Sequence, residues 1–128
     1  MTTTDPSGYA EVNGLRMYYE IHGTGTPLVL LHGAYMTIDM MEPLLAGLAK
    51  GRQVIAVELR GHGHTGDAEG PITYEQMADD CAALLGQLDL AAADVVGYSM
   101  GGATGIPLAI RHPDVVRKLV IAPASYTS

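Results

Sequence analysis

The chain has 128 residues, a length typical of a single domain, so we expect residues 1–128 to form one domain or part of one. Fourteen acidic residues against seven basic ones give a formal net charge of −7, and an acidic surface repels the phosphates of nucleic acids. No segment contains the run of about 18 apolar residues that a membrane span needs, and the N-terminus lacks a signal-peptide pattern. The composition therefore argues against nucleic acid and membrane as partners and predicts a soluble, cytoplasmic protein.

The N-terminal region alternates in hydrophobicity on either side of Asn13-Gly14, a dipeptide that favours a tight hairpin turn. This pattern predicts strands at about Tyr9–Val12 and Leu15–His22. Further along the chain, short apolar runs recur, and each is typical of a strand buried on both faces of a parallel sheet. These runs are Leu28–Leu31, Val54–Val57, Val95–Gly97 and Leu119–Ile121.

Helical patterns lie between these strands. The first ends at Lys50-Gly51 and the second begins at a predicted capping box of Thr73 and Gln76. The third begins after Ser99, and a kink or a restart is expected at Pro107 because a proline inside a helix loses a backbone hydrogen bond. The apolar stripes are Met41, Leu44, Leu45 and Leu48 in the first helix, and Met77, Cys81, Leu84, Leu85 and Leu88 in the second.

The single cysteine, Cys81, lies on the second stripe, where we expect a buried thiol rather than a reactive one. Strands that alternate with helices predict the α/β class. The expected architecture is a mostly parallel sheet with an N-terminal antiparallel hairpin and flanking helices.

The segment from Gly97 to Gly101 matches the pattern G-x-S-x-G, directly after a predicted strand and before a predicted helix. In that context the pattern indicates a sharp turn that exposes the hydroxyl of Ser99 as a nucleophile. The helix N-terminus favours developing negative charge, and the backbone N–H of Met100 is the expected donor to an oxyanion.

With this motif, three further segments resemble the α/β-hydrolase fold family: His32-Gly33 after an apolar strand, Glu58 to Thr65, which is similar to the loop D-x-R-G-x-G-x-S, and Ala109 to Val120. The resemblance runs from about Tyr9 to the end of the chain. It implies that the backbone N–H of Ala34 is the second oxyanion donor, that His32 is structural, and that no cofactor is needed.

The family's catalytic acid and histidine follow the nucleophile in the sequence, in that order. After Ser99 the only acid is Asp114 and the only histidine is His112, which precedes it. Family members continue for roughly as many residues again, so we expect a truncated α/β-hydrolase fold whose base and lid are absent from this chain.

Three functions stay open. The first is an incomplete serine esterase that acts on a small ester-like substrate, with Tyr35, Met36 and Tyr98 lining an apolar pocket. Met40, Met41 and Met100 belong to the same cluster, although methionine at helical spacing is more often simple core. The second is a non-catalytic module that self-assembles. The third is a zinc hydrolase, because His62, His64 and Asp67 resemble the zinc-binding run H-x-H-x-D.

We also expect a homo-oligomer that forms through the C-terminal strand Leu119–Ile121. If no further strand pairs with this segment, its backbone donors and acceptors form an open edge. Two copies related by a two-fold axis would pair their edges in the simplest closed symmetry.

Overall fold

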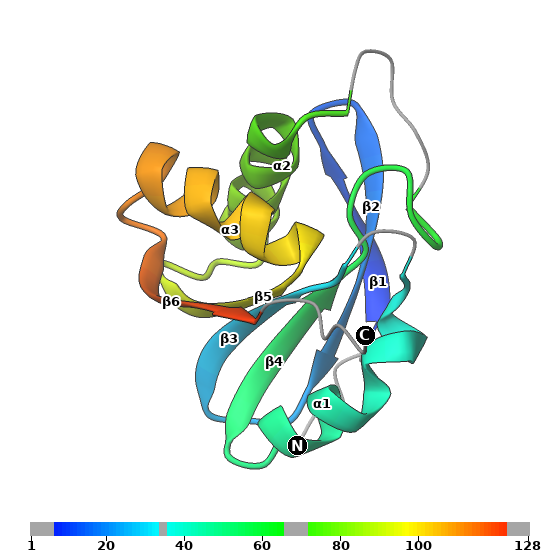
Figure 1. Cartoon of the computed structure of the whole chain (residues 1–128), viewed down its shortest axis with the longest axis vertical. Helices are drawn as coiled ribbons and strands as arrows, with labels where there is room; N and C mark the ends of the chain where they lie inside the picture. Colours follow the sequence, from blue (N-terminus) through cyan, green and yellow to red (C-terminus); the bar gives the residue numbers. More distant parts are fainter. Residues whose placement is uncertain (1–6, 34–35, 66–71, 123–128) are drawn as a thin grey trace, which may run out of the picture.

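The computed structural model describes residues 7–33, 36–65 and 72–122, which form a six-stranded sheet with helices on both faces (Figure 1). The strand order is β1-β2-β4-β3-β5-β6. Strands β3, β4, β5 and β6 run parallel, whereas β1 and β2 add to one side as an antiparallel hairpin. This is the α/β architecture that the sequence predicts. The strands are β1 Ser7–Val12, β2 Leu15–His22, β3 Thr26–Leu31, β4 Arg52–Val57, β5 Ala93–Tyr98 and β6 Val116–Ala122.

The N-terminal hairpin turns at Asn13 and Gly14, whose φ angles are 50° and 76°. Two consecutive residues with positive φ match the twist of the flanking strands, which explains why this dipeptide sets the register. Val12 accordingly pairs with Leu15, and the pairing continues to Ser7 opposite Glu20. The predicted hairpin is confirmed.

The central strands are buried on both faces, as their continuous apolar sequences predict. On one face, Val29 and Leu31 of β3 belong to a core that includes α2 (Tyr74–Gln87) and α3 (Met100–Arg111). On the other face, Leu28 and Leu30 pack with a 3₁₀ helix, η1 (Ile38–Met41), and with α1 (Glu42–Leu48). Alternate residues of one strand therefore serve two separate cores.

Helix α2 begins as predicted, because the Oγ1 of Thr73 accepts a hydrogen bond from the backbone N–H of Gln76 at 3.0 Å. The reciprocal half of the predicted capping box is missing. The side chain of Gln76 instead donates to Asp80 one turn further along the helix. The stripe formed by Met77, Cys81, Leu84 and Leu85 is buried, and burial raises the pKa of the Cys81 thiol, so this cysteine is an inert core residue.

The first predicted helix needs a correction at Leu44, whose exposed fraction is 40%. The chain starts this region as the 3₁₀ helix η1 and passes into α1, so Met41 and Leu45 form the inner face. Leu44 lies beside that face, where it borders two surface pockets.

Helix α3 runs from Met100 to Arg111 without the restart expected at Pro107. Gly105 serves packing rather than bending, because a Cβ at this position would lie 2.7 Å from Cδ1 of Leu119 in β6. The glycine therefore lets the helix approach the sheet closely.

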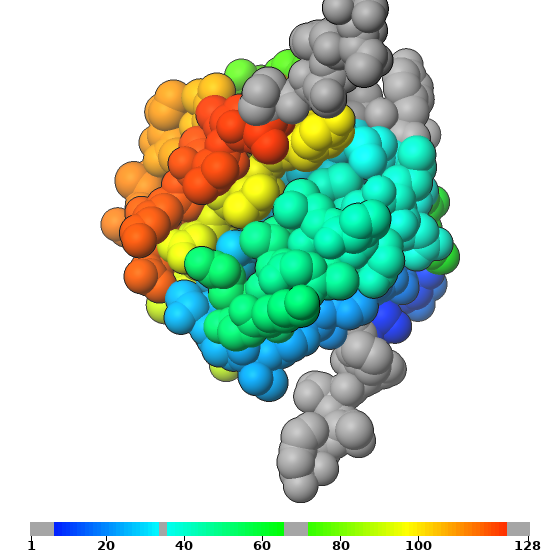
Figure 2. Space-filling view, turned by 60° about the horizontal axis from the view of Figure 1, so that its bottom comes forward, coloured from blue at the N-terminus to red at the C-terminus, as the bar shows by residue number. Residues whose placement is uncertain are grey.

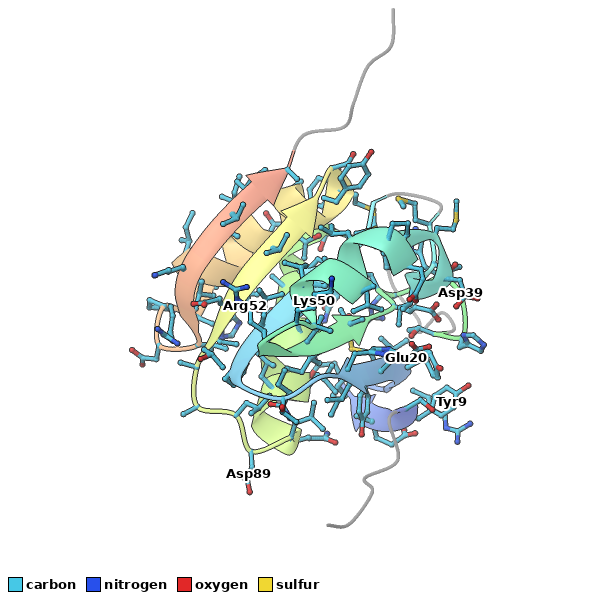
Figure 3. The ribbon with its side chains drawn as sticks, turned by 90° about the horizontal axis from the view of Figure 1, so that it is seen from below. Tyr9, Glu20, Asp39, Lys50, Arg52 and Asp89 are labelled. Carbon is cyan, nitrogen blue, oxygen red and sulfur yellow. The ribbon has the colours of Figure 1, made fainter. Side chains whose placement is uncertain are left out.

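The face of β5 and β6 beside α1 is open, and β5, β6 and α1 lie side by side on the surface in Figure 2. A trough of about 410 Å³ on this face is lined by apolar residues that include Leu28, Val96 and Val120. Charged Arg52 and Lys118 also line it, and Figure 3 shows Arg52 where β4 begins. None of the helices in the described ranges has the length and apolar character needed to cross a membrane.

Candidate active site

Ser99 occupies the single residue between the end of β5 and the start of α3. Its φ and ψ angles are 55° and −110°, a combination that is sparsely populated for residues other than glycine. The side chain is exposed, in line with the sequence prediction of a strained strand-to-helix turn that presents its hydroxyl. The turn geometry is thus confirmed, while the chemical role of Ser99 stays a prediction.

The backbone of this turn is fixed from both sides. The N–H of Ser99 donates to the carbonyl of Ala122 in β6 at 2.9 Å, and the carbonyl of Ser99 accepts from Ala103 at 3.1 Å. The motif glycines leave no room for a side chain, since a Cβ at Gly97 would lie 2.6 Å from the nitrogen of Gly102. A Cβ at Gly101 would lie 2.6 Å from the carbonyl carbon of Leu31. These contacts hold Ser99 in its strained conformation.

Met100 is the first residue of α3, so its N–H belongs to the free donors at the helix N-terminus. The helix dipole adds partial positive charge there, which suits an oxyanion that develops beside Ser99. The second predicted donor, Ala34, and the predicted pocket residue Tyr35 lie outside the described residues.

The loop that leads to Ala34 is anchored by His32, which is buried. Its Nε2 accepts a hydrogen bond from the N–H of Leu59 at 3.0 Å, so its Nδ1 carries the proton and donates to the carbonyl of Gly33 at 2.7 Å. Burial lowers the pKa of His32 below its ordinary value of 6.5 and keeps the ring neutral. His32 therefore has the structural role that the sequence predicts.

Glu58 joins the loop after β4 to the start of η1. Its buried carboxylate accepts hydrogen bonds from the N–H of Ile38 at 3.1 Å and the N–H of His64 at 2.6 Å. The ring of His64 adds a contact from Nδ1 to Oε1 at 2.9 Å. One carboxylate thus positions two loops that border the pockets beside Ser99.

Arg60 and Asp80 form a buried ion pair that the sequence analysis missed. Nε and Nη2 of Arg60 donate to Oδ2 and Oδ1 of Asp80 at 3.0 and 3.1 Å. The side chains of Asn13 and Gln76 also donate to Oδ1 of Asp80. The pair ties the loop after β4 to α2 and to the N-terminal hairpin. One sequence signal was available, because Asp80 lies three residues after Met77, on the buried stripe of its helix.

The remaining histidines have partners outside the turn at Ser99. His62 donates from Nδ1 to the carbonyl of Arg60 at 3.0 Å, and His112 contacts Asp79 at 2.7 Å. His22 contacts Glu20 at 2.8 Å, and His64 contacts Glu58 as described. Asp67 of the predicted zinc run lies outside the described residues. Within the described part of the chain, no three His, Cys, Asp or Glu side chains are grouped so that they could hold a metal ion.

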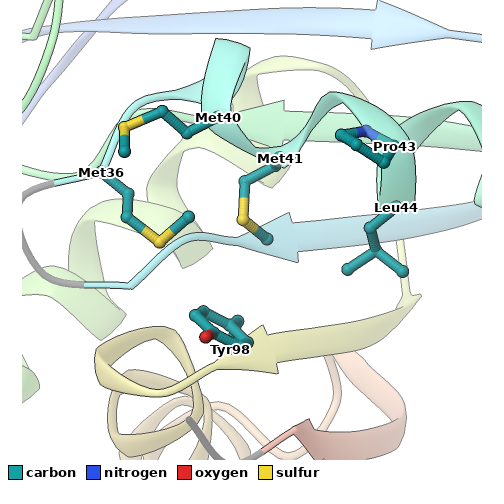
Figure 4. Close-up of a pocket in the computed structure, with 6 residues that line it drawn as sticks. All are labelled: Met36, Met40, Met41, Pro43, Leu44 and Tyr98. Atoms are coloured by element: carbon teal, nitrogen blue, oxygen red, sulfur yellow. The ribbon is translucent and has the colours of Figure 1, made fainter. Parts of the chain in front are cut away.

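Of the pockets lined by a residue next to Ser99, two also contain Met36. The first, here called the methionine pocket, has a volume of about 250 Å³, and in Figure 4 the side chains of Met36, Met41 and Leu44 extend towards the ring of Tyr98. The second, here called the loop pocket, has a volume of about 480 Å³. Met36 and Tyr98 thus both line a pocket, and their role in binding a substrate stays a prediction. The methionine pocket is lined by Met36, Met40, Met41, Pro43, Leu44 and Tyr98, and the loop pocket by Met36, Thr37, Gly61, His62, Gly63, Ile72 and Met100.

Residues 26–126 match the family described as the alpha/beta hydrolase fold. A doubly covered, mostly parallel sheet with a serine in a strained strand-to-helix turn is the arrangement that this fold uses for its nucleophile. The chain belongs to the alpha/beta hydrolase fold family.

Similar proteins carry out several hydrolytic reactions. RutD, a proposed carbamate hydrolase of Azorhizobium caulinodans, is 37% identical over 113 residues, which cover 88% of this chain and 43% of that protein. The soluble epoxide hydrolase of a Corynebacterium species is 36% identical over 124 residues, which cover 94% of this chain and 42% of that enzyme. The crystal structure of an enol-lactonase from Burkholderia xenovorans LB400 superposes with a TM-score of 0.82 at 37% identity, covering 87% and 44%. The chain thus spans less than half the length of these relatives.

Proposed function

We propose that this chain carries the nucleophile and oxyanion half of a serine hydrolase that cleaves carboxylic esters. The observation that carries the proposal is the strained, exposed Ser99 at the N-terminus of α3. Among the relatives, a lactonase and a carbamate hydrolase act on carbonyl compounds, whereas an epoxide hydrolase does not. A fold does not determine a reaction, so the choice of an ester rests on the serine and its surroundings.

In the proposed reaction, Oγ of Ser99 attacks the carbonyl carbon of the ester while a general base takes the hydroxyl proton. The carbonyl oxygen becomes negative and accepts hydrogen bonds from the N–H of Met100 and the N–H of Ala34. Collapse of this intermediate expels the alcohol, which receives the proton, and leaves an acyl group on Ser99. Water then attacks the acyl carbon, and the acid and free Ser99 are released.

The general base is proposed to come from a part of the protein outside this chain, or from another chain. His32 is buried and neutral, and His22, His64 and His112 are each bonded to a carboxylate elsewhere. His62 lines the loop pocket, and its Nδ1 is bonded to the carbonyl of Arg60 within its own loop. In this fold the acid and histidine follow the nucleophile in the sequence, and the chain spans less than half of its relatives.

Hydrolysis of p-nitrophenyl acetate with and without added imidazole tests this division of roles. Imidazole can accept the proton of Ser99, so we expect slow turnover by the chain alone and a marked increase with imidazole. Imidazole alone also hydrolyses this ester, so the rate without protein is subtracted at each imidazole concentration. The Ser99→Ala variant is then expected to show no increase, and a metal chelator is expected to change neither rate. Equal rates for wild type and Ser99→Ala in imidazole would contradict the nucleophile, and rapid turnover without imidazole would contradict the external base.

A second candidate function is self-assembly through β6, with no catalysis. It is favoured by one observation: β6 is the edge strand of the described sheet, and Val120 and Ile121 on it are 56% and 45% exposed. An apolar edge of this kind offers a template for a second copy.

Sedimentation velocity tests the second candidate. If β6 pairs with β6, the chain dimerises with rising concentration, and Val120→Lys shifts it to a monomer. Ile110→Lys is the matched control, because Ile110 is 73% exposed and belongs to α3 rather than to β6. A monomer at all concentrations, or equal effects of both substitutions, would contradict pairing through β6.

A further inference from the structure

We propose that Met36 is a specificity-determining residue that separates two substrate compartments beside Ser99. The methionine pocket would take a short, unbranched aliphatic group of the ester, and the loop pocket would take its larger and more polar group. The inference rests on the proposed function, since it assumes that the reacting carbonyl lies at Ser99.

The two residues next to Ser99 in the chain line different pockets. Its preceding residue, Tyr98, lines the methionine pocket, and its following residue, Met100, lines the loop pocket. Adjacent Cα atoms are about 3.8 Å apart, so both pockets begin within one residue of the serine. An ester has one substituent on each side of its reacting bond, and this arrangement gives each substituent its own compartment.

Met36 is the residue that lines both pockets. Its N–H donates to the carbonyl of Gly33 at 3.2 Å, which fixes its backbone close to the loop of His32. The Sδ of Met36 and the Cδ2 of Tyr98 both lie 3.1 Å from the point where a Cβ at Gly33 would stand. The thioether and the ring therefore both pack over Gly33. In the proposal these two side chains form the wall between the compartments, and Figure 4 shows both of them at the methionine pocket.

The methionine pocket suits a short aliphatic chain. Its walls are thioethers, a proline, a leucine and one aromatic ring, which favour apolar groups over polar ones. Its volume of about 250 Å³ is below the range of roughly 300–1,000 Å³ that is usual for drug-sized ligands, so a short chain is enough to fill it. Methionine side chains are unbranched and flexible, and they adapt to linear groups more readily than to rings.

The loop pocket has a different chemical character. It is nearly twice as large, at about 480 Å³, and its walls include the hydroxyl of Thr37 and the ring of His62. The backbone of Gly61 and Gly63 also faces it without a side chain in between. Tyr98 is the one lining residue of the methionine pocket whose side chain can form a strong hydrogen bond, so the more polar substituent of an ester is expected in the loop pocket.

Binding of linear alcohols to chain labelled with ¹³C in its methionine methyl groups tests the inference without any reaction at Ser99. We expect the signals of Met36, Met40 and Met41 to move, and affinity to rise about fourfold for each added methylene until the pocket is full. The signal of Met17, which is buried in the core on the other face of the sheet from the methionine pocket, is the internal control. The signal of Met100 reports entry into the loop pocket.

Substitution of Met36 then tests the wall. Met36→Ala should join the compartments, so that longer alcohols bind and also shift the signal of Met100. Met36→Leu has a similar volume and should keep the wild-type length limit, which controls for effects of substitution alone. An unchanged length limit in a folded Met36→Ala variant, or equal shifts at Met17 and Met36, would overturn the inference. If binding follows the expected pattern while Ser99 stays unreactive, the proposed function fails and the compartments stand.

Discussion

The two faces of the sheet differ in how tightly helices cover them. On the face of α2 and α3, Leu84 and Leu108 are fully buried, and a Cβ at Gly102 would lie 2.6 Å from Cγ2 of Ile121. On the face of α1, Leu44 and Val120 are 40% and 56% exposed beside open pockets. The tight face supports the turn at Ser99, while the looser face supplies adaptable walls. This contrast suits the proposed role of Ser99, because a nucleophile must be held in a fixed position.

The largest effect is expected when the buried ion pair on the tight face is broken. Asp80→Ala leaves Arg60 buried without its partner, which typically costs about 3–5 kcal/mol of unfolding free energy. Urea unfolding measures this loss. The neighbouring residue gives the control, since Asp79 pairs with Arg111 at a partly exposed site, and Asp79→Ala should cost only about 0–1 kcal/mol. Equal losses would remove the distinction between the two pairs.

A somewhat smaller effect is expected at the motif glycine that follows the nucleophile. In Gly101→Ala, the new Cβ meets the backbone of Leu31, and overpacking of this kind costs about 1–3 kcal/mol or more. Gly86→Ala is the matched control, because Gly86 lies in α2 with no atom within 4 Å of the new Cβ. There, alanine should stabilise the helix by about 0.5–1 kcal/mol in urea unfolding. We expect the unfolding free energy to fall in Gly101→Ala and to rise in Gly86→Ala. A rise in both variants would show that the turn has room for a Cβ at Gly101.

A pH-dependent effect of intermediate size is expected at His32. Because burial lowers its pKa below 6.5, the unfolded chain binds a proton more readily than the folded chain does. Stability should therefore fall as pH decreases below about 6.5, and the loss should end once pH is below the folded pKa. Urea unfolding of wild type and His32→Gln between pH 7.5 and 5 isolates this contribution. A pH slope that is identical in the two proteins would contradict it.

The smallest effect is expected on the looser face. Met40 is 59% exposed, so Met40→Leu should change the unfolding free energy by no more than about 0.5 kcal/mol. The same urea measurement applies. A loss comparable to that of Gly101→Ala would show that the wall of the methionine pocket is as rigid as the turn at Ser99.

Features that depend on local sequence were predictable. The Asn13-Gly14 hairpin and the stripe of α2 follow from turn chemistry and periodicity, and the strained angles at Ser99 follow from its flanking glycines. Features that depend on residues far away in the sequence were not predictable. Gln76 turned to Asp80 instead of completing its capping box, and Asp80 is buried because Arg60 reaches it from another loop. A sequence pattern indicates the face of a helix on which a residue lies. It does not indicate which charged side chain, from a distant part of the chain, forms an ion pair with that residue.

The central claim is that Ser99 is the nucleophile, and covalent labelling tests it most directly. A fluorophosphonate forms a bond between phosphorus and the attacking oxygen, releases fluoride, and passes the serine proton to a base. Mass spectrometry of the labelled chain in imidazole should place one adduct on Ser99, with no adduct in Ser99→Ala. Labelling that spreads over several hydroxyl groups, or that leaves Ser99 unmodified in imidazole, would contradict the account.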